Sequence, residues 1–105
     1  MRFVETPVFT AVIQRHLDDE PCRQLQIALM LRPAQGPLMK GSGGLRNVRW
    51  ATTGDGKRGG LRVVYYWAAG ERTFYMVFAC SKSAQGGLTR EQTRQLGRLV
   101  REELK

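Results

Sequence analysis

Residues 41–67 read GSGGLRNVRWATTGDGKRGGLRVVYYW and combine glycines, basic side chains and two runs of strand-forming residues. Valine, tyrosine and tryptophan favour strands, whereas glycine favours turns and loops. The pattern predicts strands at residues 45–51 and 61–69, joined by a loop that is rich in glycine and in positive charge.

Side chains alternate between the two faces of a strand, so each predicted strand divides into two sets. On the second strand Arg62, Val64 and Tyr66 share one face. On the first strand Arg46 and Arg49 point to opposite faces. We expect one face of the sheet to pack against helices and the other face to bind a ligand.

The sequence on either side extends this sheet and adds helices. A third long strand is predicted at 73–80 after a tight turn around Gly70, and a short strand at 3–5. Thr6 and Pro7 suit the cap and first position of a helix that ends near residue 17. A second helix is expected from about residue 18 to residue 32, followed by a flexible connection, residues 33–44, rich in glycine and proline.

The C-terminal segment, 88–105, predicts a helix with Leu96, Leu99, Val100 and Leu104 on one stripe and arginines on a solvated face. Together these elements predict one domain over residues 1–105. Its fold class is mixed α/β, of the α+β kind: an N-terminal helix hairpin packed on a mostly antiparallel sheet, with a C-terminal helix.

Positive charge is concentrated in the middle of the chain. The formal net charge is +8, and residues 40–82 hold eight basic residues against Asp55 and Glu71, a net of +6. Residues 1–39 sum to zero. Such a field attracts polyanions, so nucleic acid is the leading candidate partner, with a merely basic protein as the alternative.

Several familiar sites are not supported by the sequence. Residues 54–59 match GxGxxG, but they should join two strands and so lack the helix N-terminus that holds a pyrophosphate. Cys22 and Cys80 form no CxxC motif and are expected to be free thiols in a reducing cytosol. The single histidine, His16, lies in the neutral helical half. We expect no metal and no cofactor, and no membrane span or signal peptide, which predicts a cytoplasmic protein.

The order of elements, together with GSGGLRNVRW, GKRGGLRVVYYW and SKSAQGGLT, resembles the HigB-like branch of the RelE toxins of bacterial toxin–antitoxin pairs. The resemblance implies a RelE-like domain that cleaves messenger RNA in the ribosomal A site. It also implies a monomeric toxin when free and a cognate antitoxin, expected to carry a helix-turn-helix.

Particular residues match the basic positions of this branch. Arg62 matches the arginine that acts at the scissile phosphate, and Lys82 matches a further basic catalytic group. Lys57 is the third catalytic candidate. Which of these groups is the general base and which the acid stays open. The RNA-binding candidates are Lys40, Arg46, Arg49, Arg58 and Tyr66. Of these, Tyr66 could stack on a base.

Chemistry supports this implication, because RNA carries its own nucleophile, the 2′-hydroxyl. The protein must remove a proton, stabilise the phosphate and protonate the leaving oxygen, and cations can do all three. Two alternatives remain: a ParE-like toxin that binds DNA gyrase without cutting, and a non-enzymatic nucleic-acid-binding module.

Overall fold

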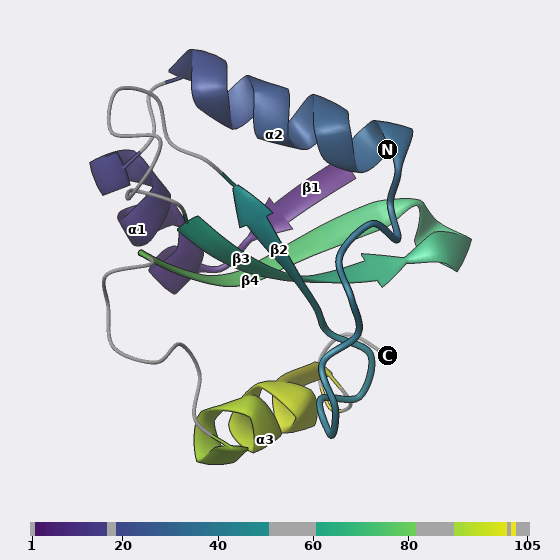
Figure 1. The fold of residues 1–105 in the computed structure, drawn as a ribbon. Helices are drawn as coiled ribbons and strands as arrows, with labels where there is room; N and C mark the ends of the chain where they lie inside the picture. The colour runs from purple at the N-terminus through teal and green to yellow at the C-terminus, as the bar shows by residue number, and fades with distance from the viewer. Residues whose placement is uncertain (1, 17–18, 51–60, 82–89, 101, 103–105) are drawn as a thin grey trace.

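The computed structural model describes residues 2–16, 19–50, 61–81, 90–100 and 102. Within these residues a four-stranded sheet has the order β1-β4-β3-β2 (Figure 1). β1 pairs in parallel with β4, and the other two pairs are antiparallel. The strands are β1 (Arg2–Glu5), β2 (Arg46–Trp50), β3 (Leu61–Ala68) and β4 (Thr73–Ser81). The predicted α+β class and mostly antiparallel sheet are confirmed.

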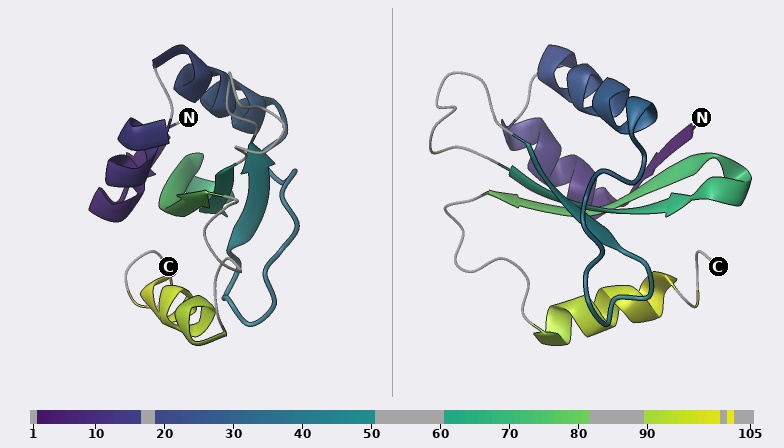
Figure 2. Two further views of the ribbon diagram at one scale, coloured as in Figure 1. Left: turned by 60° about the vertical axis from the view of Figure 1, so that its left-hand side comes forward. Right: turned by 45° about the vertical axis from the view of Figure 1, so that its right-hand side comes forward.

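Helices cover both faces of this sheet, which gives three layers (Figure 2). Helices α1 (Pro7–His16) and α2 (Asp19–Leu31) lie on one face, and α3 (Arg90–Leu99) lies on the other. None of the helices described here is both long and apolar enough to cross a membrane.

The start of α1 follows the predicted capping pattern. The Thr6 hydroxyl accepts a hydrogen bond from the Phe9 amide at 3.1 Å and donates one to the Val77 carbonyl at 2.7 Å. Pro7 occupies the first helical position, where its missing N–H is not needed. One side chain therefore both caps α1 and ties it to β4.

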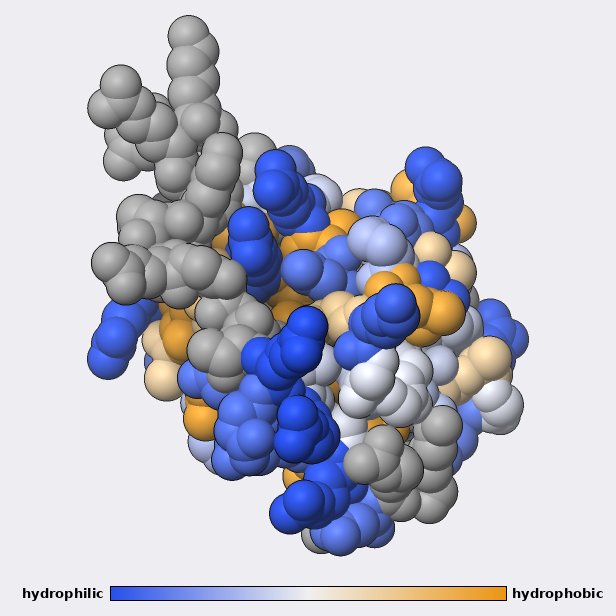
Figure 3. All heavy atoms as spheres, turned by 60° about the horizontal axis from the view of Figure 1, so that its bottom comes forward, coloured by the Kyte–Doolittle hydropathy of each residue, from blue (hydrophilic) through white to orange (hydrophobic). Residues whose placement is uncertain are grey.

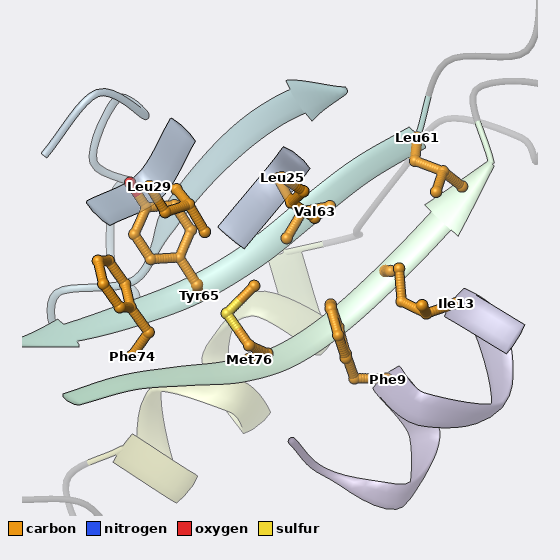
Figure 4. Packing of buried hydrophobic residues seen from close by; sticks show 10 residues of the cluster. Phe9, Ile13, Leu25, Leu29, Leu61, Val63, Tyr65, Phe74 and Met76 are labelled. Atoms are coloured by element: carbon orange, nitrogen blue, oxygen red, sulfur yellow. The ribbon is translucent and has the colours of Figure 1, made fainter. Parts of the chain in front are cut away.

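The main core lies between the sheet and the first two helices (Figure 4). Alternation on β3 sends Leu61, Val63 and Tyr65 to this side. The helices contribute side chains at helical spacing, and β4 closes the cluster. The buried partners are Phe9, Ile13, Leu25, Leu29, Phe74, Met76 and Ala79.

The opposite face is packed as well, which corrects the expectation that one face would pack and the other would be free to bind. Leu45, Val64, Val77 and Val100 form a second buried cluster beneath α3, with Leu96 and Leu99 packed against it. β4 holds one extra residue, Val77, opposite the step from Val64 to Tyr65. Such a bulge lets adjacent residues point to the same face, which enlarges the surface available to α3.

The connection between α2 and β2 is packed against the sheet, contrary to the expected loose linker. The Tyr65 hydroxyl donates to the Pro33 carbonyl at 2.7 Å and accepts from the Gly36 amide at 3.3 Å. Ser42 is fully buried, and its hydroxyl accepts from the Leu45 amide at 3.0 Å. These bonds anchor residues 33–45 before the chain enters β2.

We expect Tyr65→Phe to lower the free energy of unfolding by about 1–3 kcal/mol, because it leaves the buried Gly36 amide and the partly buried Pro33 carbonyl without their partner. Burial also raises the pKa of Tyr65 above 10.0. The neutral phenol is thus favoured in the folded state. The stability that Tyr65 contributes is therefore complete below about pH 10 and is lost as the pH rises through its raised pKa.

Chemical denaturation of both proteins across the alkaline range measures this difference. The wild type should lose stability above about pH 10 faster than Tyr65→Phe does. Parallel pH profiles would show that Tyr65 is not responsible.

Candidate nucleic-acid interface

Two arginines lie directly opposite each other on neighbouring strands. Arg49 of β2 pairs with Arg62 of β3, so both side chains emerge on the α3 side of the sheet. Residues opposed in this way have Cβ atoms about 5 Å apart, and like charges there repel. Arg49 is exposed and Arg62 partly exposed. Between described residues the one ion pair joins Arg94 to Glu91, so no described carboxylate neutralises the opposed arginines.

The strand ends around this pair are joined in one ladder. Leu61 pairs with Trp50 on one side and with Ser81 on the other, and Cys80 lies opposite Arg62. The arginine pair therefore lies at the end of the sheet where β2 ends, β3 begins and β4 ends. Three of the predicted site residues, Lys57, Arg58 and Lys82, fall outside the residues that the structure describes.

Cys80 lies beside this pair, and neither Cys80 nor Cys22 forms a disulfide bond. Burial raises the pKa of Cys80, and the positive charge of Arg62 lowers it in part. Because the first effect is larger, the thiol stays protonated at neutral pH and is a poor nucleophile. Arg62, and not Cys80, carries the charge at this place.

Arg46 is separated from the other arginines. It pairs with Tyr65, so it lies on the α1 and α2 side of the sheet. Its guanidinium Nη1 donates to the Gly36 carbonyl at 2.8 Å and to the Ala34 carbonyl at 3.2 Å. Arg46 thus binds the connection between α2 and β2, and it lies on the opposite face of the sheet from Arg49 and Arg62.

Tyr66 does share the face of Arg62, but it is partly enclosed. It packs against the cluster under α3, and its ring centroid lies 6.3 Å from that of Tyr75. A Cβ placed on Gly44 would lie 3.1 Å from Tyr66 Cε1, so the connection passes close over the ring. Four residues along a strand span about 13 Å, which separates Tyr66 from the arginine pair.

The structure forms a second basic cluster, beside α3, which the sequence analysis does not predict. Lys40 of the connection joins Arg90 and Arg94 of α3 around a cavity of about 470 Å³, which Gly41 and Thr93 also line. Hydrophilic side chains gather across this side of the molecule (Figure 3). The spacing of Arg90 and Arg94, one helical turn apart, was visible in the sequence, but their approach to Lys40 depends on tertiary packing.

None of the described carboxylates forms an ion pair with Arg49 or Arg62. Glu71 lies in the turn after β3, at the opposite end of that strand from Arg62, and its carboxylate accepts a hydrogen bond from the Tyr75 hydroxyl at 2.7 Å. Asp55 falls outside the described residues. Among described residues, no three histidine, cysteine, aspartate or glutamate side chains gather as metal ligands would.

The arrangement places Arg49 and Arg62 in cross-strand opposition at one end of the sheet and gathers three cations around a cavity beside α3. Arginine forks bind phosphate oxygens in bidentate fashion, and a phosphodiester between two arginines would relieve their repulsion. No known protein-family model matches the chain.

Proposed function

We propose that the protein is an endoribonuclease of the RelE type, the toxin of a toxin–antitoxin pair, which cuts messenger RNA on the ribosome. The observation that carries the proposal is the opposed pair of Arg49 and Arg62 on an accessible end of the sheet. No described carboxylate forms an ion pair with either arginine, and like charges in direct opposition are unfavourable unless an anion is bound between them. The resemblance of residues 41–67 to the HigB-like branch supports the same conclusion.

In this mechanism the phosphate is held by the arginine pair, and the ribose supplies the nucleophile. The 2′-oxygen attacks the adjacent phosphorus, the bond to the 5′-oxygen breaks, and a 2′,3′-cyclic phosphate forms. Negative charge grows on the non-bridging oxygens during the attack. Arg62 and Arg49 stabilise that charge more strongly in the transition state than in the ground state.

Proton transfer would fall to cations outside the described residues. Lys82 and Lys57 are the candidates, because a lysine surrounded by other cations loses its proton more readily than a free one. One group would take the proton of the 2′-hydroxyl, and the other would supply a proton to the leaving 5′-oxygen. The carboxylates of the basic segment, Asp55 and Glu71, are too few to hold a metal ion by themselves, so we propose a metal-free reaction.

A translating extract tests the function directly. Purified protein added to ribosomes that carry a defined messenger should produce discrete cuts, which primer extension detects. A parallel supercoiling assay with DNA gyrase serves as the comparison. Inhibited supercoiling with an intact messenger would contradict the proposal and favour a gyrase-binding toxin. An intact messenger with unaffected gyrase would leave only a binding module.

The opposed arginines also predict a conflict between stability and function. We expect Arg49→Ala to bind RNA more weakly than the wild type, while its free energy of unfolding rises by a few tenths of a kcal/mol, because like-charge repulsion across the strands is removed. RNA-binding titrations and urea denaturation measure the two effects. Arg23→Ala, which removes an exposed arginine of α2, is the matched control and should change neither by much. A destabilised Arg49→Ala would mean that the pair is already neutralised.

A further inference from the structure

The cavity beside α3 gathers like charges at positions where they do not stabilise the fold. Its described lining contains three cations, Lys40, Arg90 and Arg94, and no acid. Arg90 and Arg94 are one helical turn apart, a spacing at which like charges destabilise a helix. Arg90 is also the first residue of α3, where the helix dipole disfavours a cation.

The nearest described acid does little to offset this charge. Glu91 lies outside the lining and approaches Arg94 at 3.7 Å, with both side chains largely exposed. That separation is longer than the 2.7–2.9 Å of a charge-assisted hydrogen bond. Exposed pairs of this kind contribute little, so the donors of Arg94 remain available to a stronger anion.

A close backbone contact holds the two sides of the cavity together. α3 approaches the connection at Gly97, where an added Cβ would lie 2.8 Å from the Ser42 carbonyl oxygen. Ser42 is fully buried and is only two residues from Lys40. The absence of a side chain at Gly97 thus lets α3 lie against the connection and brings Lys40 to Arg90 and Arg94.

From these observations we infer that the cavity lined by Lys40, Arg90, Thr93 and Arg94 is a binding site for a phosphate group, separate from the Arg49–Arg62 pair. Its volume, about 470 Å³, is in the range of small-ligand pockets. The guanidinium and ammonium groups supply donors and charge, and the Thr93 hydroxyl can donate one further hydrogen bond. The phosphate could belong to an RNA backbone or to a free phosphate compound. The inference does not depend on the proposed cleavage.

Two probes distinguish these sources: a short fluorescent oligoribonucleotide with 2′-O-methyl groups, which cannot be cut by 2′-hydroxyl attack, and inorganic phosphate followed by ³¹P line broadening. Lys40→Ala and Arg94→Ala are the test variants. Arg98→Ala removes an exposed arginine of the same helix outside the described lining, and is the charge-matched control.

If the site holds RNA, each test variant should weaken oligonucleotide binding about tenfold and lower the salt dependence of binding by about one counterion, beyond the change in Arg98→Ala. If it holds a free phosphate compound, the test variants should lose the ³¹P broadening and keep normal RNA affinity. Test variants that match Arg98→Ala with both probes would overturn the inference.

Gly97→Ala adds a test that removes no charge. It should weaken binding of whichever probe occupies the cavity, because α3 and the connection must move apart. Gly70→Ala, where an added Cβ meets nothing within 4 Å, should not. Binding through the cavity without any cleavage of messenger would refute the proposed function and leave this site standing. Normal cleavage of messenger, together with test variants that match Arg98→Ala with both probes, would refute this site and leave the proposed function standing.

Discussion

Arg62→Ala should lower the rate of messenger cleavage by about a hundredfold to a thousandfold, the loss typical when one donor to a developing negative charge is removed. Arg62 is only partly exposed, lies directly opposite Arg49 and faces no described carboxylate. Its replacement therefore removes repulsion and breaks no described ion pair. The variant should be at least as stable as the wild type, so that lost activity reports on chemistry.

Single-turnover cleavage of ribosome-bound messenger, together with thermal unfolding, measures these two quantities. Arg62→Lys should recover only part of the rate, because an ammonium group keeps the charge but cannot form the bidentate fork. Arg23→Ala on α2 should cleave normally. Full activity in a folded Arg62→Ala protein would show that the arginine pair is not the phosphate site.

The second large effect concerns the substrate. A messenger with a single 2′-deoxy residue on the 5′ side of the cut should not be cleaved at that position, because the proposed nucleophile is absent. Cleavage of the normal messenger should persist after brief chelation with EDTA, provided that the ribosome stays assembled.

The deoxy residue should abolish one cut and leave all others unchanged, so the same messenger contains its own control. Continued cleavage at the deoxy position would require water or hydroxide as the nucleophile. The proposed roles of Arg49 and Arg62 would then have to be revised.

Local signals in the sequence predict the elements of this fold well. Thr6 and Pro7 set the start of α1 because capping depends on a few adjacent residues, and the hydroxyl of Thr6 makes the expected bond to the Phe9 amide. Alternation along β3 predicts that Tyr65 and Tyr66 lie on opposite faces of the sheet. The structure agrees, because Tyr65 belongs to the core under α1 and α2 and Tyr66 packs against the cluster under α3. Alternation also puts Arg49 and Arg62 on one face once the register is known.

Features that depend on tertiary contacts were not predictable in the same way. The packing of α3 on the second face depends on the extra residue Val77 in β4 and on the close approach of Gly97 to Ser42. The acceptors of Arg46 are carbonyl groups ten or more residues away in the chain. A basic side chain that binds RNA and one that holds a loop therefore look alike in the sequence.

The end groups of the cut messenger test the central claim most directly. They are read by treating the products with a kinase or a phosphatase and then ligating and sequencing them. Attack by the 2′-hydroxyl on a phosphate held by Arg49 and Arg62 predicts a 5′-hydroxyl on the downstream fragment and a 2′,3′-cyclic phosphate or 3′-phosphate on the upstream one. A 5′-phosphate on the downstream fragment, or a messenger that remains intact on ribosomes exposed to the folded protein, would contradict it.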